Sequence, residues 1–566
     1  MKTLHKRITH IQGEYVQNFE RARTRLFAVL LFFTFAYIIV TARLVMLMSP
    51  AILNPNHTPD IQHTHTLGIT PKRANILDRN GTLIATSLET PSLYADPKLV
   101  EDAQRLSHDL IEIFPDLSYE DIYKDLSKNR RFVWIKRHLT PKQHAAVLKL
   151  GDPALNVKTE YRRVYPHNEL FAHTLGYTDI DGKGIAGIEK QYNDTLINTD
   201  QDIELSLDVR LQDLLRSEIQ KSIDKFSAIG GSGIIMNANT GEILSLVSLP
   251  DFDPHSPKKA NDDQKFNRNT VGVYEMGSTF KIFSIAAGLE FEAIHLKDSY
   301  DVRKPMKVAR FTIRDFKPKK RDLSLAEVFV YSSNIGTAQI AETLGTEKLK
   351  NFYSDLGFFK KLDVDLPERG RPIVPKPWRD INTLTASYGH GLAVTPLHVA
   401  RATAAIVNGG TLHTPTLKQS PQKSLNLSII SPQTASTMRG LMALTVENGT
   451  GSKVKSDHVW VGGKTGTAEK IVDGKYEADK LLSSFVGVFP MDNPEYVILV
   501  TIDEPIGIKE SYGYATGGWT AAPIVGKIIE AMKPMMKDTQ DMQKGPFPAL
   551  DALRPYIKED KTHASF

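Results

Sequence analysis

The 566-residue sequence contains no cysteine. Disulfide bonds, zinc sites built from thiolates and a cysteine nucleophile are therefore all excluded. The chain also has little excess charge, because 70 Lys and Arg residues nearly balance 65 Asp and Glu residues and leave a net charge of +5. This balance gives no general case for nucleic-acid binding. We find no internal repeat and no low-complexity tract, and the length predicts two or more folded domains.

One long apolar run stands near the N-terminus. Residues 26–40 are apolar apart from Thr34, and the run continues through residues 44–48. As a helix, these about 23 residues would span roughly 34 Å, more than a hydrocarbon core of about 30 Å. We therefore predict a transmembrane anchor at residues 26–48. The alternative, a cleaved signal peptide, is disfavoured by the long segment before the run and by the lack of a small-x-small site near residue 48.

Positive charge is distributed unevenly around this run. After Arg43, which can extend toward the headgroups, the next Lys or Arg is Lys72. Several basic residues precede the run: Lys2, Lys6, Arg7, Arg21, Arg23 and Arg25. By the positive-inside rule, residues 1–25 form a cytoplasmic tail and the chain beyond the anchor lies outside.

The part that follows the anchor begins with a linker rich in Pro, His and Thr at residues 50–70. Short β-type runs then alternate with helical segments: strands at 83–87 and 132–135, helices around 100–129 and 141–150. The apolar residues of 208–225 recur at helical spacing and predict a long amphipathic helix that leads into the next domain. We assign residues 49–225 to an elongated α+β pedestal domain.

The pattern changes after residue 225. Residues 233–248 predict a β-hairpin around the turn 239–242, and later strands are expected at 460–464, 484–489 and 496–502. Between them lie helices around 279–290, 324–345, 383–406 and 432–448. The fold class is therefore α+β, with a second domain at 226–536 in which helices cover an antiparallel sheet. Residues 537–566 are polar and contain proline, and we expect a mobile tail.

A candidate nucleophile stands in the sequence Ser278-Thr279-Phe280-Lys281. On a helix, residues i and i+3 share a face, so the Lys281 amine can meet the Ser278 hydroxyl and, once neutral, act as its base. The S-x-x-K pattern alone is weak, because it also occurs at Ser222/Lys225, Ser256/Lys259, Ser420/Lys423 and Ser452/Lys455. Ser278 differs in its context, since Gly277 precedes it and an apolar helix at 282–289 follows it.

Two further patterns follow Ser278 along the chain. Ser332-Ser333-Asn334 opens an apolar helix at 335–344, although such a serine often only caps a helix. The run 464–467 (KTGT) occurs once, on a predicted strand. A strand that presents a lysine, two hydroxyls and a glycine can hold a substrate carboxylate against its edge. S-x-x-K, S-x-N and K-T-G in this order form the constellation of penicillin-recognising enzymes.

With these motifs the chain resembles a class B penicillin-binding protein, and more closely the septal transpeptidase than the elongation one. The resemblance runs from the anchor to about residue 530. In the first external module it is carried by residues 73–81 (RANILDRNG), 163–166 (RVYP) and 187–189 (GIE). Near the catalytic motifs it is carried by residues 267–270 (NRNT), 274–277 (YEMG), 387–391 (SYGHG), 394–397 (VTPL), 517–519 (GGW) and 521–523 (AAP). Ala74 and Met276 replace the family's usual glycine and proline.

The resemblance implies a role for each motif residue. Ser278 would attack the penultimate D-Ala carbonyl of a stem peptide that ends in D-Ala-D-Ala, and Lys281 would take its proton. Ser332 and Asn334 would relay protons and hold the substrate amide, with Lys464 supporting them electrostatically. Thr465 and Thr467 would bind the terminal carboxylate, with Gly466 beside them as a further substrate-binding residue. The backbone N–H groups of Ser278 and Thr467 would form the oxyanion hole. A side-chain amine of a neighbouring stem peptide would then complete the cross-link.

The same resemblance implies the protein's surroundings. It predicts an inner-membrane protein at the division site with a periplasmic catalytic domain, β-lactams as inhibitors, and partners that include a SEDS-family glycan polymerase and other division proteins. It implies no metal, no organic cofactor and no nucleic acid. His57, His63 and His65 lie in a polar linker, where coincidence is a better explanation than a metal site.

Four other functions compete with this one. A membrane-anchored class D-like β-lactamase is disfavoured by Asn334, by the large first module and by the lack of an E-x-x-x-N motif between Asn334 and Lys464. A bifunctional class A synthase is disfavoured because the first module has no recognisable glycosyltransferase signature. A non-catalytic division scaffold is disfavoured by the intact set of Ser278, Lys281 and Lys464. A β-lactam sensor is disfavoured because the sequence predicts a single span without a cytoplasmic protease or DNA-binding segment.

Overall fold

The structure is a computed structural model that describes Arg23 and residues 25–43, 71–308, 311–419, 427–472, 474–535 and 544–558. It divides into two units, Met1–Ile69 and Thr70–Phe566, which are described separately. Among the described residues of the first unit, one helix spans Arg25–Arg43, and an 18-residue window of it has a mean hydropathy of 2.1. Its apolar side chains are exposed instead of packed into a core, and its length and composition allow it to cross a membrane. Residues 1–22, 44–48 and the predicted linker lie outside the described residues.

The second unit begins with a five-stranded sheet. Its longest pair joins β2 (Leu83–Ala95) and β4 (Leu155–Val164), which run antiparallel from Thr86↔Val164 to Ala95↔Leu155. Strand β3 (Val133–Lys136) pairs with the end of β2, and β1 (Ile76–Leu77) links β2 to β5 (Ile203–Glu204). The predicted strands at 83–87 and 132–135 are therefore confirmed, and the first one is longer than its apolar run.

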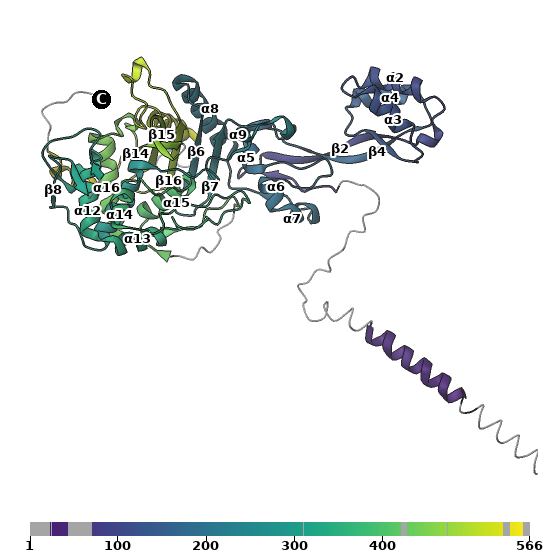
Figure 1. The fold of residues 1–566 in the computed structure, drawn as a ribbon, viewed down its shortest axis with the longest axis horizontal. Helices are drawn as coiled ribbons and strands as arrows, with labels where there is room; N and C mark the ends of the chain where they lie inside the picture. Colours follow the sequence, from purple (N-terminus) through teal and green to yellow (C-terminus); the bar gives the residue numbers. More distant parts are fainter. Residues whose placement is uncertain are drawn as a thin grey trace, which may run out of the picture. The chain divides into compact units, whose positions relative to one another are not determined.

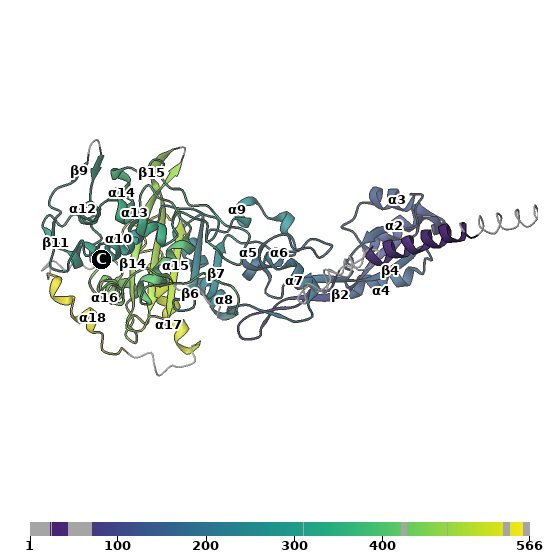
Figure 2. The same cartoon turned by 90° about the horizontal axis from the view of Figure 1, so that it is seen from below.

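Three helices pack together at the β3 end of β2 (Figures 1 and 2). They are α2 (Ala103–Ile113), α3 (Tyr119–Leu126) and α4 (Pro141–Leu150). Each begins at a side-chain cap, given by Asp102, Ser118 and Thr140, which satisfies backbone N–H groups of the first turn. Their apolar faces form a small core around Leu106, Leu110 and Phe114.

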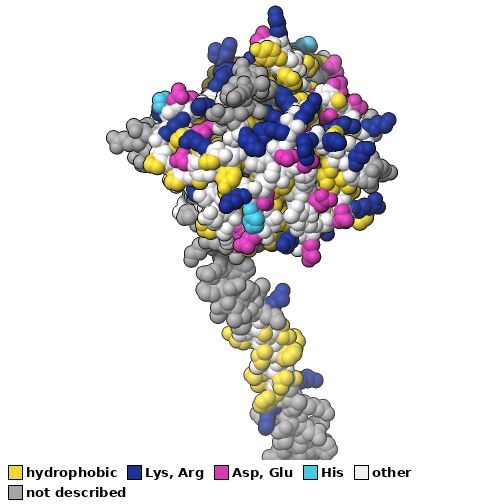
Figure 3. All heavy atoms as spheres, turned by 90° about the vertical axis from the view of Figure 1, so that its left-hand side faces the viewer, with side chains coloured by type: hydrophobic (Ala, Val, Ile, Leu, Met, Phe, Trp, Pro, Cys, Tyr) yellow, Lys and Arg dark blue, Asp and Glu magenta, His cyan; other side chains and the backbone are white. Residues whose placement is uncertain are grey.

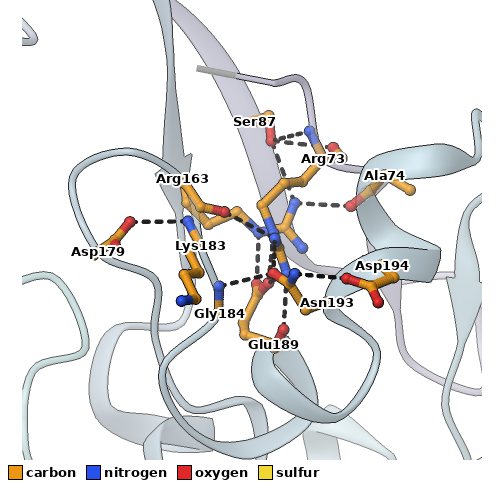
Figure 4. A network of polar contacts seen from close by, with 11 residues as sticks. Arg73, Ala74, Ser87, Arg163, Asp179, Lys183, Gly184, Glu189, Asn193 and Asp194 are labelled. Atoms are coloured by element: carbon orange, nitrogen blue, oxygen red, sulfur yellow. Dashed lines mark hydrogen bonds and ion pairs between the residues drawn. The ribbon is translucent and has the colours of Figure 1, made fainter. Parts of the chain in front are cut away.

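A buried ion cluster joins the distant parts of the first module (Figure 4). The carboxylate of Glu189 accepts from Arg73 Nε at 2.9 Å and from Arg163 Nε at 2.6 Å, and all three side chains are almost fully buried. Arg73 also donates to the carbonyl of Gly182 and to Asn193 Oδ1. The sequence motifs at 73–81, 163–166 and 187–189 thus meet at one point.

The catalytic motifs lie around a second five-stranded sheet of order β14–β15–β16–β6–β7, antiparallel throughout. Its strands are β6 (Gly230–Asn237), β7 (Ile243–Leu249), β14 (Gly462–Val472), β15 (Lys475–Phe489) and β16 (Tyr496–Asp503). The β6–β7 hairpin confirms the prediction for residues 233–248. The strand that carries Lys464 stands at the edge of this sheet.

Helices cover both faces of the sheet (Figures 1 and 2). Helices α8 (Val209–Phe226) and α17 (Ala522–Met532) pack on one face, where Ile235 and Val500 point. Helices α10 (Lys281–Glu290), α15 (Pro396–Val407) and α16 (Pro432–Asn448) pack on the other, where Ile234 and Leu499 point. The alternation of neighbouring residues between the two cores follows the two-residue period of a strand. The predicted helix at 208–225 is confirmed as α8.

Shorter elements complete the second unit. They are α5 (Ala172–Leu175), α6 (Gly187–Gln191), α7 (Asn193–Asn198), α9 (Asp262–Lys265), β8 (Ser299–Asp301), β9 (Met306–Val308), β10 (Phe311–Ile313), β11 (Asp322–Ser324), α13 (Thr346–Asp355), β12 (Thr411–Leu412) and β13 (Leu427–Ser428).

Two helices predicted as continuous are broken. The expected helix at 324–345 is α11 (Leu325–Val330) followed by α12 (Asn334–Leu344), with Ser332 between them at a φ of +62°. The expected helix at 383–406 is α14 (Asp380–Ser387) followed by α15, separated by a loop in which Gly389 and Gly391 also have positive φ. A residue in the left-handed conformation cannot continue a right-handed helix, so the backbone turns at both of these points.

The prediction of a mobile tail at 537–566 is wrong for residues 544–558. These residues form α18 (Pro548–Asp551) and a 3₁₀ turn at Arg554–Tyr556. Phe547, Leu550 and Leu553 are buried against α16. Apolar side chains at a spacing of three, in an otherwise polar stretch, form the buried face of these short helical turns.

Candidate active site

Ser278 lies in a 3₁₀ turn, Gly277–Phe280, that leads directly into α10. With three residues per turn, side chains at i and i+3 are eclipsed, so Lys281 lies beside Ser278. Gly277 has a φ of +53°, and a Cβ atom there would lie 2.6 Å from the carbonyl oxygen of Thr467. Glycine is therefore required for this turn to lie against β14.

The Lys281 amine is the centre of the site. Its Nζ atom lies 3.1 Å from Ser278 Oγ, 2.7 Å from Asn334 Oδ1, and 2.7 and 3.0 Å from the carbonyl oxygen and Oγ of Ser332. The carbonyl of Ser332 and Oδ1 of Asn334 can only accept hydrogen bonds. A neutral amine has two N–H groups for these two acceptors, which leaves its lone pair for a hydroxyl proton.

The surroundings of Lys281 favour this neutral form. The side chain is fully buried, and burial followed by the positive charge of Lys464 holds the pKa of Lys281 well below its usual range. The carboxylate of Asp315 opposes this shift, but with a smaller effect. A buried lysine beside another cation loses its proton readily, which makes Lys281 suited to act as a base.

Ser332 and Asn334 reach Lys281 because the chain turns sharply between α11 and α12. Ser333 caps α12 by accepting from the N–H of Gly336 at 3.0 Å. Asp315 in turn accepts from Ser333 Oγ at 2.8 Å and from the N–H of Ile335 at 3.0 Å. The capping serine is therefore Ser333, and Ser332 is left to point its hydroxyl at the two lysines.

Lys464 on β14 also contacts Ser332. Its Nζ lies 2.8 Å from Ser332 Oγ, so this hydroxyl bridges the two lysines. Burial lowers the pKa of Lys464 to about 7. The Lys464 amine can therefore exchange its proton near neutral pH, with Ser332 as the link to Lys281.

The residues that follow Lys464 lie along the same strand. Thr465 Oγ1 is 2.7 Å from Thr450 Oγ1, and Thr467 Oγ1 accepts from the N–H of Gly517 at 3.2 Å. A Cβ atom on Gly466 would lie 2.7 Å from the carbonyl oxygen of Met276. Gly466 is thus required for the turn that carries Ser278 to lie close to the strand, and its role toward a substrate stays a prediction.

Sequence reasoning missed a second group of residues beside the site. Glu275, three residues before Ser278, accepts from the N–H of Gly391 at 2.9 Å and from the Tyr476 hydroxyl at 3.0 Å. The ring of His390 stacks on Tyr476 with centroids 5.9 Å apart. Burial raises the pKa of Glu275, and it lowers that of His390 to about 4. The only signal in the sequence was the presence of Glu275 and His390 in runs that resemble the family.

The structure brings all the predicted site residues together: Ser278, Lys281, Ser332, Asn334, Lys464, Thr465, Gly466 and Thr467. Within the described ranges, no group of three or more His, Asp or Glu side chains is placed to hold a metal ion. His57, His63 and His65 lie outside those ranges, as do Ser420 and Lys423.

Comparison with known proteins identifies two domains in this chain. Residues 231–530 match the penicillin binding protein transpeptidase domain, and residues 68–224 match the penicillin-binding protein dimerisation domain. A probable peptidoglycan D,D-transpeptidase FtsI of Caulobacter vibrioides is 36% identical over 484 residues, covering 83% of this chain and 82% of that protein. The peptidoglycan D,D-transpeptidase FtsI of Escherichia coli K12 is 26% identical over 505 residues, covering 83% and 84%.

Solved structures share the fold. Penicillin binding protein 3 of Mycobacterium tuberculosis, complexed with aztreonam, has a TM-score of 0.67 at 22% identity and covers 85% of this chain and 98% of that one. The fold and the site define an enzyme built around a half-buried serine beside a fully buried lysine. The chain belongs to the penicillin-binding protein transpeptidases.

Proposed function

We propose that this enzyme is a serine D,D-transpeptidase that cross-links peptidoglycan stem peptides during septal wall synthesis, with Ser278 as nucleophile. The observation that carries the assignment is the position of the buried Lys281 Nζ, 3.1 Å from Ser278 Oγ and 2.7 Å from Asn334 Oδ1. Relatives named FtsI and peptidoglycan D,D-transpeptidase support the reaction and the division role.

Acylation begins when neutral Lys281 takes the hydroxyl proton of Ser278. The Oγ atom bonds to the penultimate D-Ala carbonyl carbon, and the peptide bond to the last D-Ala breaks. The leaving amine takes up a proton through the Lys281 and Ser332 network. In the second half, the amine of a neighbouring stem peptide attacks the ester carbonyl, a new amide bond forms, and Ser278 regains its proton.

Two groups around Ser278 complete the proposed site. The turn at Gly277 lies against the backbone of Thr467, which supports the N–H groups of Ser278 and Thr467 as oxyanion donors. The hydroxyls of Thr465 and Thr467, with the charge of Lys464 behind them, would bind the terminal carboxylate of the donor peptide. A β-lactam would place its own anionic group there and acylate Ser278, in keeping with the aztreonam complex of the mycobacterial protein.

The rest of the chain would place this reaction at the membrane. We propose that the N-terminal helix is the single anchor, with residues 1–25 in the cytoplasm and the catalytic domain in the periplasm. The first module has no chemistry of its own, and we propose that it docks membrane partners such as a SEDS-family polymerase and other division proteins.

The test is a pulse of fluorescent penicillin on the detergent-purified full chain, followed by a chase with unlabelled drug. We expect a covalent adduct that is stable for many minutes and is lost in Ser278→Ala. Ser452→Ala is the matched control, because Ser452 also belongs to an S-x-x-K sequence but is exposed, in the turn Ser452–Val454. Label that turns over within seconds would indicate a β-lactamase instead. No label on folded wild-type protein would favour a non-catalytic scaffold.

A further inference from the structure

A carboxylate without a counter-cation lies beside the nucleophile. Glu275 accepts hydrogen bonds from the N–H of Gly391 at 2.9 Å and from the Tyr476 hydroxyl at 3.0 Å, and both of these donors are uncharged. Among the residues that the structure describes, no Lys, Arg or His side chain forms an ion pair with Glu275. Burial raises the pKa of Glu275, as expected for a carboxylate that has lost water and gained no cation.

Two segments hold this carboxylate close to Ser278. Glu275 itself comes three residues before Ser278, and Gly391 belongs to the loop 387–391. In this loop the carbonyl of Gly389 accepts from the N–H of Gly277 at 3.3 Å. A Cβ atom on Gly389 would lie 2.0 Å from the carbonyl oxygen of Gly277, so the loop and the nucleophile turn are in direct contact. The position of the carboxylate relative to Ser278 is therefore fixed.

Aromatic side chains surround the same carboxylate. The ring of Tyr476 stacks on His390, and the ring centroid of His390 lies 5.4 Å from that of Tyr388. Burial, followed by the negative charge of Glu275, raises the pKa of Tyr388 to about 12, so this ring lies within the field of the carboxylate. Burial lowers the pKa of His390 to about 4, so the imidazole is uncharged at neutral pH. The cluster thus combines a carboxylate with tyrosine rings, two groups that attract a cation.

The cluster lies against the strand that is proposed to hold the donor peptide. Met276, the residue after Glu275, contacts β14 at Gly466, where a Cβ atom would lie 2.7 Å from the carbonyl oxygen of Met276. Tyr476 lies on β15, the neighbour of β14. Glu275 and His390 are half-buried and Tyr476 is 47% exposed, so these side chains are open to a ligand.

The negative charge is a local feature of this site. The whole chain carries a net charge of +5, and Figure 3 shows Lys and Arg side chains spread over the visible face of the second unit. A cation would therefore be attracted here by the Glu275 cluster itself, and the field of the whole protein would add nothing to this attraction.

We propose that Glu275, together with the rings of Tyr388 and Tyr476, binds the side-chain ammonium of a stem peptide. The inference rests on the proposed function, in which the acceptor stem peptide reacts through a side-chain amine. Donor and acceptor are both stem peptides, so the same ammonium is present on each. A bound ammonium supplies the counter-charge that Glu275 lacks, and the cluster selects stem peptides whose amine is free.

The test measures, by anisotropy, how a fluorescently labelled stem tripeptide that ends in a diamino acid binds to the full-length protein in detergent. The side-chain amine of this probe is either free or acetylated. We expect acetylation to weaken binding to wild type about tenfold, because a charge-assisted hydrogen bond to Glu275 is lost. Glu275→Gln should bind the free-amine probe as weakly as wild type binds the acetylated probe, and in this variant acetylation should have no further effect.

The matched control is Glu290→Gln. Glu290 is also half-buried, and it also accepts from a backbone N–H and a hydroxyl, both of Ser431. This variant should keep the wild-type difference between the two probes. A second variant, Tyr476→Phe, removes the hydrogen bond to Glu275 but leaves the carboxylate and the ring in place. It should keep most of that difference, whereas it would match Glu275→Gln if the cluster only fastened the β14–β15 hairpin.

Kinetics assign the ammonium to the donor or to the acceptor. Release of D-Ala from a pentapeptide donor and transfer to the free tripeptide are measured for wild type and Glu275→Gln. A KM for the free-amine donor that rises about tenfold in the variant, with that of the acetylated donor unchanged, assigns the ammonium to the donor. An unchanged donor KM with a lower ratio of transfer to hydrolysis assigns it to the acceptor. If wild type releases no D-Ala, the proposed function fails, while the binding measurement still decides this inference.

The inference is wrong if wild type binds the free and acetylated probes equally. It is also wrong if Glu275→Gln keeps the preference for the free amine, or if Tyr476→Phe loses this preference as fully as Glu275→Gln does. Penicillin labelling of Ser278 reports whether each variant is folded. If Glu275→Gln does not fold, Glu275→Asp replaces it, and its shorter carboxylate should weaken binding of the free-amine probe alone.

Discussion

The buried ion cluster of the first module offers a sharp test of what stabilises that part of the protein. Glu189 is the carboxylate that contacts both Arg73 and Arg163, and the cluster already carries one more positive than negative charge. In Glu189→Gln, two guanidinium groups stay buried without a counter-charge, and one side-chain oxygen is replaced by an amide N–H that faces other donors. We expect this change to destabilise the module strongly.

The magnitude follows from the burial. Side chains of Arg73, Arg163 and Glu189 are 1%, 2% and 0% exposed, so solvent cannot screen the change. Removing one partner of such a buried pair costs about 3–5 kcal/mol. For a domain of this size, that cost lowers the apparent midpoint of thermal unfolding by roughly 6–20 °C.

The assay is thermal unfolding of the full chain in detergent, followed by near-UV circular dichroism. The matched control is Asp181→Asn, which makes the same change of carboxylate to amide. Asp181 forms an ion pair with Arg137, and its side chain is 74% exposed. The control should cost about 0–1 kcal/mol. Penicillin labelling of Ser278 at room temperature should survive in both variants. If the two variants shift the midpoint equally, the buried cluster does not stabilise the module in the way argued here.

Three further predictions concern the catalytic part. The rate of penicillin acylation should fall as pH rises through about 7, where Lys464 loses its proton. The variant Lys464→Arg stays charged and should keep its acylation rate above that pH. A fall in the rate of this variant at the same pH would contradict the assignment. Leu550→Ala should lower stability by about 2–4 kcal/mol in denaturant titration, because Leu550 is fully buried, whereas exposed Leu427→Ala should change it little. Gly466→Ala should slow acylation about 100-fold, since its Cβ would displace the Ser278 turn, and Gly526→Ala on α17 should not.

Periodicity in the sequence was sufficient for the elements that depend on local pattern. The apolar positions of α8 recur at helical spacing, and the turn at 239–242 separates two apolar runs, so both were predictable. The order of the three catalytic motifs predicted which residues meet. In the structure, the hydroxyls of Ser278 and Ser332 both lie within hydrogen-bonding distance of the Lys281 amine.

Other features depend on contacts that no local pattern contains. The break between α11 and α12 depends on Asp315, which lies in a different segment and holds Ser333. The C-terminal turns are held by α16, where Gly440 leaves room for the backbone of Ala549. A polar stretch with a few apolar residues cannot show that such a partner exists, and the tail was therefore predicted to be mobile.

The strand order of the catalytic sheet has a consequence for how the protein is made. Strand β6 pairs with β16, and Gly230 lies opposite Asp503. The hydrogen bonds between these two strands can therefore form only after Asp503 has been synthesised. The turn with Ser278 and the three helices on its face are synthesised in between, and residues 544–558 come after β16. With the topology proposed above, export from the N-terminus would carry the nucleophile across the membrane before the sheet beneath it can close. We expect the first module to fold early and the catalytic centre to become competent only after β16 has followed, which would delay wall synthesis until the sheet is complete.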